Sequence, residues 1–100
     1  MKIVQVVPRS DAPAKLKSLL KKKELSLRGT STTLYRQREG RWRHVKYPGW
    51  INWEEAPGGI LVAEVQSKAE ASDWQLLQSF IGYLDRHFGK YIDTISIHYR

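Results

Sequence analysis

The fold class is decided by residues 60–88, whose sequence is ILVAEVQSKAEASDWQLLQSFIGYLDRHF. Residues 60–66 are rich in β-branched side chains, which predicts a strand. After them, large apolar side chains recur every three or four positions, the spacing of an amphipathic helix, at Trp74, Leu77, Ile81, Leu84 and Phe88. A strand followed by such a helix predicts a sheet with helices packed against it.

The ends of this helix carry signals of their own. Ser67 or Ser72 is expected to cap its N-terminus, because each is followed three residues later by a side chain that completes a capping box, Glu70 or Gln75. Gly89 is expected to end the helix, since glycine is favoured just past a helix C-terminus.

The same pattern of strand and helix begins the chain. Residues 2–7 are a predicted strand with apolar side chains at odd and even positions, which is typical of a central, largely buried strand. Pro8 ends this strand, and Ser10 or Asp11 is expected to cap a first helix that combines a leucine stripe with several lysines.

The middle and the end of the chain supply further strands. Residues 32–38 and 41–47 are predicted to pair through a turn at Glu39-Gly40, residues 50–55 form a possible short strand, and residues 91–99 form the last strand. The expected order is strand, helix, three or four strands, helix, strand. We therefore predict one α+β domain over residues 1–100, a two-layer sandwich with a mostly antiparallel sheet and both helices on one face.

The composition narrows the classes of function. The chain has 100 residues, 41% of them hydrophobic, and no cysteine. Disulfides, a thiolate nucleophile and a cysteine metal cage are thereby excluded, and a cytoplasmic location is expected. The apolar runs are too short for a secretory signal or a membrane span, so no membrane association is expected.

Charge gives the clearest indication of a partner. The formal net charge is +7 and the isoelectric point is about 9.9. Such a charge favours nucleic acid, an anionic membrane surface or an acidic protein. The alternative is that the charge only keeps a small domain soluble.

The predicted hairpin concentrates part of this charge. If Glu39-Gly40 is a two-residue turn, Arg38 lies opposite Arg41, and Arg36 lies opposite Arg43. All four arginines then project from one face of the sheet, and two pairs of like charges oppose each other, which is destabilising. A local rule broken in this way is typical of a functional site, and arginine suits phosphate because its planar group binds two oxygens at once.

Aromatic side chains complete the predicted site. A turn at Pro48-Gly49 places Tyr47 opposite Trp50 on the arginine face, where both could stack on bases. The run Lys21, Lys22 and Lys23 would extend the positive field, although it could equally serve to complement the dipole of the first helix. We therefore predict a non-enzymatic module that binds RNA or single strands, with its site at Arg36, Arg38, Arg41, Arg43, Tyr47, Trp50, Lys21, Lys22 and Lys23.

The residues leave other interpretations open. The arginines could form a solvated face, Glu54 could neutralise Arg43, and a slip of one residue in the hairpin would scatter the four arginines. A protein-binding adaptor is the alternative function, with Trp50 and Trp53 as contacts or an exposed strand edge as the docking point.

Enzymatic and metal chemistry find little support in the sequence. A metal-free ribonuclease could use His44, Tyr35 and Glu39 with the arginines, but the predicted register puts His44 and Tyr35 on the other face. His87 and His98 lie far from His44 in the sequence and show no ligand spacing, so neither a metal nor a cofactor is expected.

Overall fold

The computed structural model describes residues 1–11, 13–25, 27, 34–68 and 70–99, and among these the side chains of residues 13, 14, 70 and 71 are left aside. Two predictions fall partly outside these ranges. Thr32 and Thr33, expected to begin the second strand, are not described, and neither is the side chain of Glu70 in the expected capping box.

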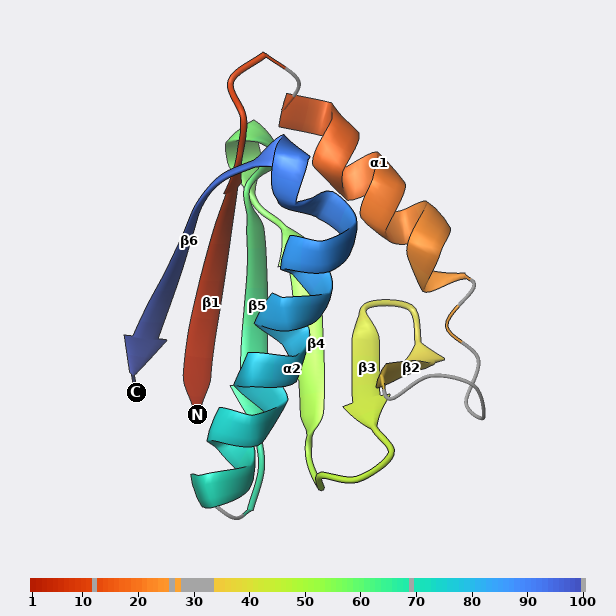
Figure 1. Ribbon diagram of the computed structural model, residues 1–100, viewed down its shortest axis with the longest axis vertical. Helices are drawn as coiled ribbons and strands as arrows, with labels where there is room; N and C mark the ends of the chain where they lie inside the picture. The colour runs from red at the N-terminus through yellow and green to blue at the C-terminus, as the bar shows by residue number, and fades with distance from the viewer. Residues whose placement is uncertain (12, 26, 28–33, 69, 100) are drawn as a thin grey trace.

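The strands and the two α-helices follow one another in the order that the sequence predicted (Figure 1). The elements are β1 (Lys2–Pro8), α1 (Pro13–Glu24), β2 (Leu34–Arg38), β3 (Arg41–His44), β4 (Trp50–Glu55), η1 (Pro57–Gly59), β5 (Leu61–Gln66), α2 (Glu70–Phe88), η2 (Gly89–Tyr91) and β6 (Ile92–Tyr99). The possible strand over residues 50–55 is therefore present. Ser72 lies inside α2 and is not its N-cap, whereas the helix ends at Phe88, immediately before Gly89.

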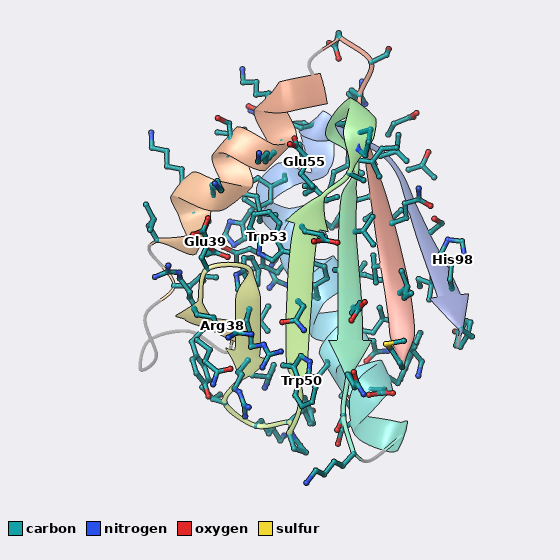
Figure 2. All side chains as sticks on the ribbon, turned by 180° about the vertical axis from the view of Figure 1, so that it is seen from behind. Arg38, Glu39, Trp50, Trp53, Glu55 and His98 are labelled. Carbon is teal, nitrogen blue, oxygen red and sulfur yellow. The ribbon has the colours of Figure 1, made fainter. Side chains whose placement is uncertain are left out.

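The six strands form one sheet in the order β2-β3-β4-β5-β1-β6, and every neighbouring pair is antiparallel. Both helices lie on the same side of this sheet, which leaves the other side open (Figures 1 and 2). The predicted two-layer α+β sandwich is thus confirmed, with β2 and β6 at its two edges.

The core fills the space between the sheet and the helices. Alternate residues of β1 are buried there, including Val4 and Val6, and they pack with leucines of α1 and α2 and with Trp42 of β3. The remaining residues of β1, such as Ile3 and Gln5, are only half-buried on the open side. The prediction of a central, largely buried strand is confirmed, since β1 lies inside the sheet and each of its residues is buried or half-buried. The residues on the open side are less buried because no second layer of helices covers that face.

Candidate nucleic-acid interface

The β2–β3 hairpin has the predicted turn but not the predicted register. Arg38 pairs with Arg41 as expected, but beyond that point Arg36 pairs with Trp42 and Tyr35 with Arg43. The register shifts between Arg36 and Arg38, where Gln37 is the extra residue of a β-bulge. A shift of one residue moves every side chain beyond it to the opposite face.

Arg36 is the arginine that changes face. Because it pairs with Trp42, which is fully buried in the core, its side chain lies on the helix side of the hairpin. Its Nε is 3.6 Å from Oε1 of Glu24, the last residue of α1. The prediction that all four arginines share one face is therefore wrong. Arg36 lies on the helix side and pairs with Glu24.

Glu24 is a buried carboxylate that anchors this end of the sheet. Its side chain is 3% exposed, and Oε2 accepts hydrogen bonds from the indole N–H of Trp42 at 2.6 Å and of Trp53 at 2.9 Å. The backbone N–H of Gly40 in the hairpin turn donates a third bond to the same oxygen at 3.1 Å. A buried charge is tolerated when it is hydrogen-bonded and paired in this way. Glu24 thus fastens the hairpin to α1, and the sequence analysis did not identify it.

Three arginines remain on the open face of the sheet, at Arg38, Arg41 and Arg43. Arg41 donates from Nε to Oδ1 of Asn52 at 2.7 Å, and its guanidinium lies 5.1 Å from the ring of Trp50. Arg43 donates from Nε to Oε1 of Gln37 at 3.0 Å. These partners are neutral amides and an aromatic ring, so they orient the guanidinium groups without cancelling their charge.

Aromatic side chains flank these arginines. Trp50 is half-buried and shares the open face with Asn52, two residues further along β4 (Figure 2). Tyr35 is also half-buried and pairs with Arg43, so the bulge has exchanged Arg36 for Tyr35 on this face. We use the name arginine face for Tyr35, Arg38, Arg41, Arg43 and Trp50.

Tyr47 is not part of the arginine face. The strands β3 and β4 pair with Trp42 opposite Ile51 and Arg41 opposite Asn52, so Tyr47 lies in the connection and does not oppose Trp50. Its ring is 4.7 Å from that of His44 and packs on the edge of the core. The predicted and observed registers of β3 against β4 differ by four residues. Because four is an even number, each side chain of β4 lies on the face that was predicted for it.

The lysine run at the end of α1 lies in the helix layer, on the other side of the sheet from the arginine face. Lys21 is 3.3 Å from the carboxylate of Glu39 at the hairpin turn, and Lys22 is exposed. Lys23 lies close enough to His87 to help lower the pKa of that imidazole, after burial, which is the main cause. The lysines add to the field around the hairpin, but they do not continue the arginine face.

Acidic residues mark where the arginine face ends. Asn52, Trp53, Glu54, Val62 and Glu64 line a shallow hollow of about 210 Å³ on β4 and β5. Glu64 pairs with Asn52, directly beyond Arg41 in the same row across the sheet. Glu54 pairs with Val62 and is not opposite Arg43, so the predicted neutralisation of Arg43 by Glu54 is wrong. The positive surface is thereby confined to β2, β3 and the start of β4.

The histidines are spread over the fold. His44 pairs with Leu34 on the helix side of the hairpin, where burial and, to a lesser extent, Lys46 lower the pKa of its imidazole. Its Nδ1 accepts a hydrogen bond from the backbone N–H of Lys46 at 2.9 Å. Among the described residues, no group of three histidine or acidic side chains is placed to hold a metal ion.

The two tryptophans named as possible protein contacts have different environments. Trp53 is 7% exposed and donates to Glu24, so it belongs to the core. Trp50 is half-buried on the open face beneath Arg41. Trp50 and Trp53 therefore cannot both contact one partner at the surface, because their side chains lie on opposite sides of β4.

Comparison with known proteins gives no independent indication of function. Searches with protein-family models, against curated proteins and against solved structures find no match to this chain. In the part of the chain that the structure describes, no helix is long and apolar enough to cross a membrane.

Proposed function

We propose that the arginine face binds a short stretch of nucleic acid, RNA or a single strand, and that the protein is a non-enzymatic binding module. Arg38, Arg41 and Arg43 contact phosphates, while the ring of Tyr35 and the part of the Trp50 ring that Arg41 leaves uncovered stack on bases. A cytoplasmic location, which fits the cysteine-free sequence, is part of this proposal.

The observation that supports this proposal most directly is the set of partners that the arginines have. The side-chain hydrogen bonds described for Arg41 and Arg43 use Nε alone and end on neutral amides, and the other contact of Arg41 is with the neutral ring of Trp50. No carboxylate of a described residue forms a salt bridge with Arg38, Arg41 or Arg43. Guanidinium groups that are held in place and keep their charge are suited to phosphate oxygens.

The shape and charge of the face favour single strands over duplexes. Adjacent strands are about 4.8 Å apart, so the distance from β2 to β4 is about 10 Å, enough for two or three nucleotides. Stacking on Trp50 or Tyr35 requires bases that are not already stacked in a duplex. A longer ligand that crossed the sheet would meet Glu64 and Glu54, which repel phosphates.

A salt titration with a labelled single strand tests the proposal. Three phosphate contacts predict a slope of about −2 in a plot of log affinity against log salt concentration, since single strands contribute about −0.7 per contact. Fluorescence anisotropy with short RNA and DNA strands, and with matched duplexes, measures this slope. Binding that does not weaken with added salt would contradict the proposal.

A pair of charge-matched variants locates the site. Arg41→Gln with Arg43→Gln is expected to weaken binding at least tenfold, because two of the three phosphate contacts are lost. The control, Lys68→Gln with Arg86→Gln, removes the same charge from exposed positions outside the arginine face and is expected to weaken binding far less. Equal loss in both variants would mean that net charge alone attracts the nucleic acid.

The ribonuclease alternative lacks its histidine at the site, although Tyr35 lies on the arginine face. His44 lies on the helix side of the hairpin, whereas the arginine face lies on the open side, so a proton donor and the phosphate-binding cations are separated by the sheet. Incubation of a mixed RNA pool with the wild type and with His44→Ala is expected to leave the RNA intact in both cases.

A further inference from the structure

We propose that the open edge of β6 is a self-association surface, on which β6 of a second copy pairs antiparallel to extend the sheet across a two-fold axis. β6 pairs with β1 on one side, and no described strand pairs with its other side (Figure 1). Its outward N–H and C=O groups can therefore accept another strand. This proposal does not depend on nucleic-acid binding.

The two edges of the sheet differ in how they resist such pairing. β2, at one edge, has five residues, a bulge and two arginines, and these features prevent the approach of another strand. β6, at the other edge, has eight residues and neither lysine nor arginine between Ile92 and Tyr99. Its one irregularity and its one charged residue, Asp93, lie at its start. The stretch after Asp93 is regular and contains no acidic residue, lysine or arginine.

The helix side of β6 carries apolar surface that the fold leaves partly uncovered. Ile95 and Ile97 are half-buried at the margin of the core, and Tyr99 is 70% exposed. Tyr99 is thus the most exposed large apolar side chain in the described part of the chain, where Met1, Leu25, Val45 and Trp74 are also exposed. A strand added to β6 would bury the isoleucines, and burial of apolar area is the main source of binding energy.

The sequence of β6 matches itself in the antiparallel direction. In a two-fold pair with continuous faces, opposite residues must be an even number of positions apart, and an axis at Ser96 satisfies this rule. Ile95 then faces Ile97 of the second copy on the helix side, and Thr94 faces His98 of the second copy on the open side. Ser96 faces its own counterpart at the axis.

Charge also favours a second copy as the occupant. In this register Asp93 lies level with Tyr99 of the second copy, and the Lys2 ammonium is 5.6 Å from the centre of that ring within each copy. The arginines of the arginine face lie on β2 and β3, four or five strand spacings from β6, or about 19–24 Å, while salt screens charges beyond about 8 Å. The charge of the arginine face therefore opposes pairing through β6 only weakly.

The first test is the mass of the protein in solution. Sedimentation or light scattering, from micromolar to near-millimolar concentration, is expected to show a monomer–dimer equilibrium for the wild type. Ser96→Lys is expected to abolish the dimer, because it places two lysines opposite each other at the axis. The control is Gln5→Lys, which pairs with Ser96 in the neighbouring strand and shares its face but not the edge.

The absence of cysteine allows a second test of the register. Ser96→Cys brings two thiols opposite each other at the axis, with Cα atoms within the range of about 4.4–6.8 Å that a disulfide requires. Mild oxidation is expected to trap a covalent dimer of Ser96→Cys and none of Gln5→Cys. A wild type that stays monomeric at near-millimolar concentration would overturn the proposal. A dimer that survives Ser96→Lys, or that Gln5→Lys abolishes equally, would overturn it as well.

Discussion

At one end of the sheet the β2–β3 hairpin is short, bulged and charged, whereas at the other end β6 is long, regular and almost free of charge. The hairpin pairs with β4 at only two positions, and the buried carboxylate of Glu24 binds Gly40 and Trp42 of the hairpin and Trp53 of β4. β6 depends mainly on its pairing with β1, over most of its length. Polar anchoring fixes one end of the molecule in place and leaves its arginines available, while the other end keeps an unused edge.

Removing the anchor should have the largest effect. Glu24→Leu leaves the indole N–H groups of Trp42 and Trp53 and the N–H of Gly40 without their acceptor, and a loss of about 3–5 kcal/mol in the free energy of unfolding is expected. Chemical denaturation measures the loss, and hydrogen exchange should show it first in β2 and β3. The control is Glu39→Leu, whose exposed pair with Lys21 should change stability by less than about 1 kcal/mol. Uniform loss of protection across β6 and β2 would contradict a local anchor.

The connection from β3 to β4 should be the next most sensitive position. Gly49 has φ +113°, and a Cβ there would lie 2.2 Å from the backbone oxygen of Gln66. Gly49→Ala is expected to cost about 3 kcal/mol, from strain and from displacement of the loop that fixes the arginine face. Gly58→Ala is the matched comparison, since Gly58 also has a positive φ, +85°, but open space around it. Gly58→Ala should lower the free energy of unfolding by about 1 kcal/mol. An equal decrease of the melting temperature in both variants would show that the close packing at Gly49 has no effect.

The two arginines of β2 should separate into a structural and a surface residue. Arg36→Ala removes the cation beside the buried Glu24, and a loss of about 1 kcal/mol is expected because that carboxylate loses its paired charge. Arg38→Ala should leave stability almost unchanged but weaken nucleic-acid binding. Thermal unfolding and anisotropy on the same two variants measure both effects. A larger loss of stability in Arg38→Ala than in Arg36→Ala would contradict the placement of Arg36 beside Glu24 and of Arg38 on the open face.

Mild acid should have the smallest effect. Burial, followed by neighbouring cations, lowers the pKa of His44 and of His87 below the ordinary 6.5. The unfolded state therefore binds more protons just below pH 6.5, and stability should fall slightly as the pH decreases through that value. Protonation of His44 would also remove its Nδ1 as an acceptor for the N–H of Lys46. Melting temperatures at neutral and mildly acidic pH measure the slope, which should be shallower in His44→Gln.

Much of the fold follows from periodicity that the sequence displays directly. The spacing of apolar residues predicts α2 to its last residue, and Trp50–Glu55 is a strand over the expected range. The faces of β4 were also predictable, because an error of four residues in register leaves the alternation of sides unchanged. In the hairpin, by contrast, the predicted register was wrong by one residue beyond Gln37. The prediction therefore placed Arg36 on the arginine face, where the structure has Tyr35.

The sequence by itself determined the α+β class, the order of elements and a basic, cysteine-free composition, because these depend on local patterns and on counts. The tertiary structure alone decided which arginines stand together and which edge of the sheet stays open. Both depend on contacts between distant residues. The carboxylate of Glu24 meets Trp42, Trp53 and Gly40 only after α1 has packed on the sheet, and it fixes the register at which the hairpin docks.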